Sequence, residues 1–321
     1  MKENNMKNII KRLIIFSVIV VPLITVHAQP IKLIVPVPPG SLVDNLARLM
    51  GTEISKKLNE NVVIENKPGA SGSIATSFAA KAAPNGNTMV IGNLGTISMY
   101  PVLNPDFNGF NDKSFAPVCL IGGGPLVLYT NGSIPANNLK ELLQYFKENP
   151  TNASWGSPGI GTGPHLLGEQ LKSQYKIDSM VHVLYRGLAP AYIDLFANRV
   201  SMVFDSYSPN MAGLIAAGKV KPIFITDSKP LGNIAAAPDS SFHIKDWFGL
   251  FVPAGTPEPV LKKLQAACDS VVNDPVVKEQ LITFGTPPLN VKPADVQTYI
   301  DNEKKKWVSM VDRINNKDKN K

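Results

Sequence analysis

Short apolar runs alternate with amphipathic segments through the first third of the chain. Residues 31–37 form a β-branched run, and apolar positions over 43–58 then recur at helical spacing. Further strand-like runs occupy residues 61–65 and 88–92, with a helix expected over 74–83 between them. This strand–helix–strand–helix–strand order predicts a parallel, doubly wound α/β sheet.

The same alternation continues in the middle of the chain. Strands are expected over 126–130, 153–156, 180–185 and 200–205, and helices over 138–148, 167–175, 191–196, 260–272, 276–284 and 295–314. Two α/β units and a helical tail, without a third sheet, predict two lobes with a ligand cleft between them. We expect a discontinuous first lobe of residues 29–122 plus 251–321, and a second lobe of residues 123–250.

Two loops stand where a strand-like run meets the start of a helix. They are residues 36–44, called the first loop, and residues 157–165, called the second loop. Each exposes backbone N–H groups at a helix N-terminus, where the helix dipole favours an anion. Neither loop contains Lys or Arg. Two such loops predict two jaws that close on one small anion, outside the carboxyl ends of the strands.

The first loop has the spacing of a helix cap. Ser41 is expected at the N-cap and Asp44 to return to the N-cap N–H, as in a capping box. Gly40 permits a positive φ and a close approach of ligand to backbone. A purely structural helix start explains the same residues. The ligand-binding candidates of this loop are Val37, Pro39, Gly40, Ser41 and Asp44.

The second loop carries three glycines in the spacing G-x-G-x-G, not the G-x-G-x-x-G of dinucleotide-binding folds. Its ligand-binding candidates are Ser157, Gly159, Gly161, Thr162 and His165. The hydroxyls of Ser157 and Thr162 are suited to donate to a carboxylate. His165 is equally explained as an anion donor and as a cap or packing residue.

Three further polar residues follow strands and are expected to line the same cleft. Asn93 and Thr96 come after the strand over 88–92, and Asp205 ends the strand over 200–205. Asp205 is suited to accept from an ammonium or hydroxyl of the ligand. A turn residue that bonds its own backbone is the alternative.

Catalytic and metal-binding patterns are sparse. After residue 28 the histidines are His165, His182 and His243, and no two have metal-ligand spacing. We therefore expect no metal, no cofactor and no enzymatic activity. The alternative class is a periplasmic hydrolase on the same fold that uses Ser157 and His165.

The N-terminus reads as an export signal. A basic start precedes an apolar run over 13–26, and a small-residue cleavage site ends at Ala28. Cleavage after Ala28 would release the mature protein into the periplasm. The whole chain has 32 Lys and Arg against 25 Asp and Glu, with several lysines in the terminal region. A solvated helix face and tail explain this excess better than nucleic-acid binding does.

Cys119 and Cys268 are the two cysteines of the chain. An exported protein permits their pairing, but two cysteines far apart in sequence do not make a disulfide framework. Cys268 follows two alanines in an expected helix. Packing as a small apolar residue is therefore favoured over a disulfide.

Many short segments, in order along nearly the whole chain after residue 28, resemble the Bug-type extracytoplasmic solute receptors, the substrate-binding proteins of tripartite tricarboxylate transporters. They are residues 34–36 (IVP), 39–40 (PG), 44 (D), 63–70 (VIENKPGA), 79–86 (AAKAAPNG), 115–118 (FAPV), 157–161 (SPGIG), 165–166 (HL), 185–187 (YRG), 204–205 (FD), 217–219 (AGK), 247–249 (WFG) and 253–257 (PAGTP).

The resemblance implies a periplasmic binding protein of type II, a Venus flytrap. It implies that the two loops grip a ligand carboxylate through backbone N–H groups, hydroxyls and water, and that a monomer delivers the ligand to a membrane transporter or sensor. Two departures bear on ligand choice. Ser41 stands where the family usually has a second Gly, and residues 231–245 lack the family's Pro-Thr-x-x-Glu-x-Gly element.

Overall fold

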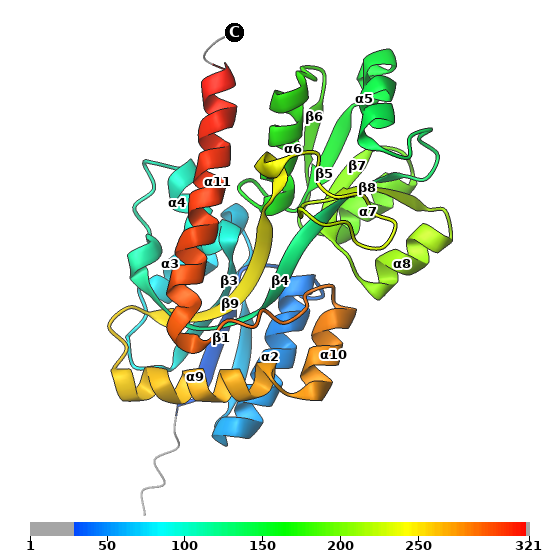
Figure 1. Ribbon diagram of the computed structural model, residues 1–321. Coiled ribbons are helices and arrows are strands. Elements are labelled where there is room, and N and C mark those ends of the chain that lie inside the picture. Colours follow the sequence, from blue (N-terminus) through cyan, green and yellow to red (C-terminus); the bar gives the residue numbers. More distant parts are fainter. Residues whose placement is uncertain (1–28, 319–321) are drawn as a thin grey trace, which may run out of the picture.

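The computed structural model describes residues 29–318 and shows a two-lobed α/β molecule (Figure 1). Its sheet has the order β2-β1-β3-β9-β4-β7-β5-β6, and β8 pairs with β4 beside this path. The strands are β1 (Ile31–Val35), β2 (Val62–Asn66), β3 (Thr88–Asn93), β4 (Phe115–Asn131), β5 (Ser154–Ser157), β6 (Val181–Leu184), β7 (Met202–Ser206), β8 (Val220–Ile225) and β9 (Lys245–Pro253). The predicted two-lobed periplasmic-binding-protein fold is confirmed.

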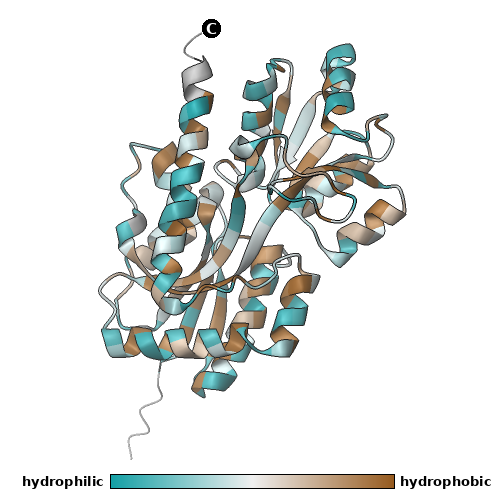
Figure 2. Cartoon of the chain, viewed as in Figure 1, coloured by the Kyte–Doolittle hydropathy of each residue, from teal (hydrophilic) through white to brown (hydrophobic). Residues whose placement is uncertain are grey.

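Helices cover both faces of the sheet in each lobe. The helices are α2 (Leu42–Leu58), α3 (Ser73–Ala80), α4 (Tyr100–Leu103), α5 (Leu139–Glu148), α6 (Gly163–Tyr175), α7 (Leu188–Phe196), α8 (Pro209–Ala216), α9 (Glu258–Val272), α10 (Pro275–Thr283) and α11 (Val296–Asp318), with a short 3-10 helix η1 (Ala70–Gly72) and a π-helix η2 (Leu94–Met99). Figure 2 shows polar and apolar residues mixed along α9 and α11, as expected for helices with one buried face.

The first lobe is built on β1, which pairs in parallel with β2 and β3. Four of its five residues are buried, because helices cover both of its faces. One apolar cluster joins this strand to α2 and α9, through residues such as Met50 and Val271. A second cluster continues across both lobes, from Ile34 of β1 to Trp155 of β5 and Trp307 of α11.

Two long antiparallel strands, β4 and β9, connect the lobes (Figure 1). The sequence predicts only the part of β4 over 126–130, because Pro117, Pro125 and the glycines at 122–124 read as turn residues. In the structure Gly123 donates from its N–H to Pro287 O at 3.0 Å while the strand continues. The expected lobe boundaries after residues 122 and 250 both fall inside these two strands.

Cys119 and Cys268 form a disulfide, so the expectation of two unpaired, apolar cysteines is wrong. Cys119 lies on β4 and Cys268 on α9. Packing of α9 on β4 brings their Cα atoms to 6.2 Å, within the range of disulfides. The contact depends on tertiary packing across 149 residues of sequence, which the local pattern around each cysteine does not report.

The predicted export signal, residues 1–28, lies outside the described residues. Within residues 29–318, helices that combine the length and the apolar character needed to cross a membrane are absent.

Candidate ligand-binding site

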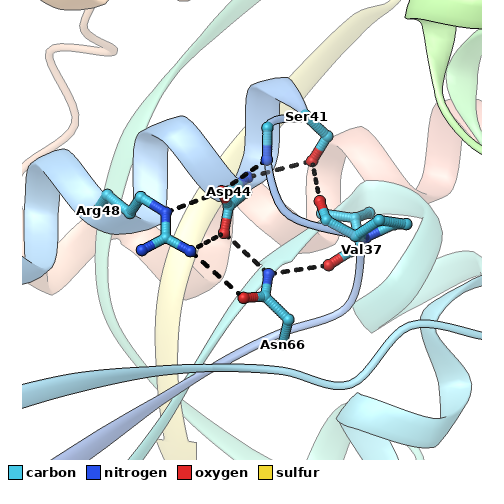
Figure 3. A network of polar contacts seen from close by, with 7 residues as sticks. Val37, Ser41, Asp44, Arg48 and Asn66 are labelled. Atoms are coloured by element: carbon cyan, nitrogen blue, oxygen red, sulfur yellow. Dashed lines mark hydrogen bonds and ion pairs between the residues drawn. The ribbon is translucent and has the colours of Figure 1, made fainter.

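The first loop leads from β1 into α2 and is tied together by its own polar groups (Figure 3). Ser41 is the N-cap, as predicted, and its Oγ accepts from Asp44 N at 3.4 Å. The return bond of the capping box differs from the expectation. Asp44 Oδ2 accepts from the N–H of Gly40 at 2.8 Å, one residue before the N-cap. Gly40 has a φ of +83°, the left-handed region that favours glycine.

Asp44 is the buried centre of this network, with 1% of its surface exposed. Arg48 Nε donates to Oδ2 at 2.9 Å, and Asn66 Nδ2 donates to Oδ1 at 2.8 Å (Figure 3). Asn66 Nδ2 also donates to Val37 O at 3.0 Å. Burial raises the pKa of Asp44, but the hydrogen bonds from Arg48, Asn66 and Gly40 outweigh burial and lower the pKa below its usual value. The ionised Asp44 side chain therefore holds the first loop in its conformation through these hydrogen bonds.

The second loop leads from β5 into α6 and repeats this design. Gly161 has a φ of +82°, and its N–H donates to His165 Nδ1 at 3.2 Å. The N-cap is Thr162, whose hydroxyl donates to Gly159 O at 2.6 Å and makes no cap bond to the helix. The N–H groups in the first turn of α6 are therefore not capped by the Thr162 side chain.

His182 is a member of this site that the sequence reasoning missed. Its Nε2 lies 2.7 Å from Ser157 Oγ, its ring stacks on Trp155, and its ring centroid lies 4.7 Å from that of His165. Parallel pairing of β5 with β6 sets Trp155 beside His182. The hydrolase alternative expected Ser157 to pair with His165. In the structure Ser157 pairs with His182 instead. Only the β5–β6 register reveals this pair.

Both histidines are half-buried. Burial, followed by the nearby His182, lowers the pKa of His165 to about 4. Burial also lowers the pKa of His182. Both rings are therefore neutral at pH 7, and His165 Nδ1 is an acceptor there.

The two lobes touch where the second loop meets the first lobe. A Cβ atom placed on Gly95, in η2, would lie 3.2 Å from Gly161 O and 3.4 Å from Thr162 Cα. Just before it, Asn93 Oδ1 accepts from Thr96 N at 2.9 Å, and Thr96 Oγ1 accepts from Asn93 N at 3.0 Å. The sequence analysis names Asn93 and Thr96 but not Gly95, which lies between them and faces the second loop.

The first loop joins the same surface from the other side. A Cβ atom on Gly72, in η1, would lie 3.1 Å from Pro36 Cβ and 2.7 Å from Thr96 Cγ2. A Cβ atom on Gly159 would lie 3.9 Å from Ser71 Oγ. The first loop, η1, the start of η2 and the second loop are thus neighbours. Pro39 lies within the first of these segments.

Asp205 lies at the end of β7 and is held by two donors. Tyr192 OH donates to Oδ2 and Ser206 N to Oδ1, each at 2.7 Å. Burial outweighs these bonds and raises the pKa of Asp205 to about 6. A second buried carboxyl, Asp246 of β9, was not predicted. Burial raises its pKa to about 7, with a smaller contribution from Asp205. Its Oδ2 would lie 3.6 Å from a Cβ on Gly163, at the start of α6.

Metal binding finds no support in residues 29–318, where no cluster of three or more His, Cys, Asp or Glu side chains is arranged to hold an ion. The recurring chemistry of the site is instead that of uncharged donors. The N-termini of α2 and α6 and several hydroxyls gather at the two loops, while the N–H groups of Gly40 and Gly161 are already bonded to Asp44 and His165.

Known proteins share this fold and sequence. The family model described as tripartite tricarboxylate transporter family receptor matches residues 46–316. A UPF0065 protein of Bordetella pertussis is 33% identical over 288 residues, which cover 87% of each chain. The solved periplasmic binding protein BugD is 29% identical, with a TM-score of 0.76, over 89% of this chain and 97% of its own. A solved Rhodopseudomonas palustris protein with adipate is 27% identical, with a TM-score of 0.80, over the same shares. The match covers most of the chain in sequence and in structure, as the resemblance to Bug-type receptors implies, and the protein belongs to the tripartite tricarboxylate transporter receptor family of periplasmic solute-binding proteins.

Proposed function

We propose that this protein captures a small organic carboxylate between the first and second loops and delivers it to a membrane transporter or sensor. One observation carries the proposal. Both loops present a glycine at a φ near +80° directly before a helix N-cap, at Gly40 and Gly161, and both lie against the same lobe contact. Uncharged N–H groups at two helix N-termini are suited to an anion. The relative solved with adipate carries a ligand of this chemistry.

The ligand-binding residues that we propose are those predicted from the sequence. They are Val37, Pro39, Gly40, Ser41, Asp44, Asn93, Thr96, Ser157, Gly159, Gly161, Thr162, His165 and Asp205. Backbone N–H groups and hydroxyls supply most of the donors. Asp44 and His165 act on the ligand through the loop backbone that they hold. Asp205 is placed for a hydroxyl or ammonium of the ligand.

The same proposal sets the organisation of the mature protein. Residues 1–28 direct export, and cleavage after Ala28 releases the mature protein into the periplasm. The mature protein has one lobe of residues 29–122 plus 251–321 and a second lobe of residues 123–250, and it acts as a monomer. Nucleic acid is not among the expected partners. N-terminal sequencing of the periplasmic form tests the cleavage position, because a first residue other than Gln29 excludes it.

Thermal unfolding with and without small carboxylates tests the binding proposal. A ligand at 100 times its Kd adds about 2.7 kcal/mol to the unfolding free energy. At about 2–4 °C per kcal/mol, the Tm should rise by about 5–10 °C. Gly40→Val and Gly161→Val should each abolish the rise by filling the approach to the backbone. Gly218→Val is the matched control for Gly40→Val, because at both positions φ is positive and an added Cβ meets no atom within 4 Å, whereas a Cβ on Gly161 would lie 2.9 Å from Leu103 Cδ1.

Neutral amides of the same acids complete the test, since they lack the charge that the helix N-termini favour. They should shift the Tm little. Equal stabilisation by acids and amides overturns the proposal. So does an unchanged response in both loop variants when they remain folded. Ser41→Gly, which restores the usual family residue, should keep binding and change the ranking among acids.

We further propose that the chain is not an enzyme. The Ser157–His182 contact has the distance of a nucleophile and its base, but Ser157 has no exposed surface. His182 is held between Trp155 and His165, which fixes the ring as a packing and loop-supporting group. Turnover of esters or amides that Ser157→Ala abolishes would establish the hydrolase instead.

A further inference from the structure

The two loops are built alike and differ in the charge of one group. In each, the third residue of the helix accepts a hydrogen bond from the glycine four residues earlier. Asp44 accepts from Gly40 in the first loop, and His165 accepts from Gly161 in the second. The two glycines have nearly equal φ angles, +83° and +82°. The acceptor is a carboxylate in one loop and an imidazole in the other.

The charge of the first acceptor is balanced locally. Arg48 forms an ion pair with Asp44, with Nε 2.9 Å from Oδ2. In the second loop the groups that face His165 are different. They are the ring of His182 from β6, at 4.7 Å between centroids, and Glu169 of α6, with Oε1 3.7 Å from Nε2. A carboxylate in place of His165 would therefore sit at the N-terminus of α6 beside an acid.

The imidazole is an acceptor only while Nδ1 carries no proton. Accepting the Gly161 N–H fixes the neutral tautomer with its proton on Nε2. The buried surroundings favour that neutral form, since burial and His182 oppose a positive charge at His165. This hydrogen bond from Gly161 N–H to His165 Nδ1, called the strut below, therefore holds the loop without adding a charge.

We propose that His165 is a positioning residue of the second loop, a neutral acceptor that holds Gly161 in its left-handed conformation while adding no charge of its own at the N-terminus of α6, where Asp246 of β9 is the neighbouring carboxyl. The hydrogen bond stands on the geometry alone. Its consequence for a ligand rests on the function proposed above. The helix end then keeps its preference for the ligand carboxylate, which a carboxylate at position 165 would oppose.

Amide hydrogen exchange of Gly161, followed by NMR in the full mature protein, tests the strut without any ligand. His165→Phe removes the acceptor, so the protection of the Gly161 amide should fall at least about fivefold, the equivalent of one net hydrogen bond. His165→Asn and His165→Asp should restore protection, because their Oδ1 atoms are suited to take the place of Nδ1. The Gly40 amide is the internal reference, and His243→Asn is the control variant.

A pH series adds a readout that simple packing would not move. In the wild type the Gly161 amide should lose protection as the pH falls towards 4, where Nδ1 of His165 takes up a proton. His182, whose pKa burial also lowers, is the other histidine that faces His165, and Glu169 is the nearby acid. The loss should be absent in His165→Asn. The Gly40 amide should stay protected, because hydrogen bonds keep the pKa of Asp44 below its usual value.

Calorimetry with small carboxylates, adipate included, then tests the charge argument. His165→Asp should bind at least about thirtyfold more weakly than His165→Asn, because like charges about 7 Å apart repel at an intermediate dielectric. Equal affinity of these two variants overturns the charge argument. Unchanged Gly161 protection in His165→Phe overturns the strut. If no carboxylate binds the wild type while the exchange results hold, the proposed function fails and the strut stands.

Discussion

A single methyl group at Gly95 is expected to oppose lobe closure. Gly95 belongs to η2 in the first lobe, and its neighbours Gly161 and Thr162 belong to the second. The added Cβ of Gly95→Ala would lie 3.2 Å from Gly161 O and 3.4 Å from Thr162 Cα. These contacts are tighter than ordinary van der Waals contacts, and each neighbour must move by a few tenths of an ångström.

The size of the expected change in Kd depends on how much the added methyl group destabilises the closed form. Overpacking of this kind costs about 1–2 kcal/mol in the closed form, the lower part of the usual range. In an open form the lobes are apart and the two contacts with the second loop vanish, which leaves only the 3.4 Å contact of the added Cβ with Asn93 Oδ1 inside the first lobe. The Kd for a ligand that requires closure should therefore rise about five- to thirtyfold. Alanine is also the better helix former, so the Tm without ligand should be unchanged or slightly higher.

Calorimetry for the Kd and thermal unfolding for the Tm measure these opposite effects on one variant. Gly213→Ala, within α8, is the control because a Cβ there meets no atom within 4 Å. It should leave the Kd unchanged. A Gly95→Ala protein that binds as tightly as the wild type refutes the reasoning, because the Gly95–Gly161 approach would then have no part in the bound state.

Three further predictions concern stability. Replacing both Cys119 and Cys268 by Ala should lower the unfolding free energy by about 3–5 kcal/mol in urea titrations, and an equal urea midpoint for variant and wild type contradicts a stabilising disulfide. His165 has a folded pKa of about 4, below its unfolded value, so its contribution is complete above about pH 6.5 and is lost as the pH falls to 4. The unfolding free energy of His165→Asn relative to the wild type should then rise by about 1.4 kcal/mol for each unit that the pH falls across that window. A difference that does not change with pH argues against a buried neutral ring. Asp246 is the opposite case. Its pKa of about 7 is raised on folding, so Asp246→Asn should be more stable at pH 8, by up to about 4 kcal/mol, with the gain gone near pH 4. A gain that does not depend on pH would show that Asp246 is not the group that titrates.

Local patterns in the sequence predict those parts of the fold that depend on local forces. The β-branched run of β1 and the Ser41 cap of α2 are found as expected, because burial on two faces and helix capping each leave a local trace. The full length of β4 leaves none, since its prolines and glycines read as turns. They are tolerated there because the strand crosses between the lobes and, at Gly123, donates a hydrogen bond to Pro287 O outside the sheet.

The candidate site divides in the same way. Both loops are visible as strand-to-helix junctions, so their residues are named from sequence alone. Their partners are not, because Asn66, His182 and Gly95 reach the loops only through sheet register and lobe contact. The disulfide belongs with these, since no spacing rule joins Cys119 to Cys268.

The cross-link between β4 and α9 also changes the topology of the molecule. Cys119 and Cys268 close residues 119–268, which include β5 to β9, into one covalent ring. The second lobe is therefore an insertion within this ring. A protease that cuts one peptide bond within that ring opens a loop but frees no fragment. The nicked chain stays a single molecule, with its halves joined through sulfur, until a reductant enters. In an oxidising compartment, a single cut in the second lobe therefore leaves the two halves of the protein covalently joined.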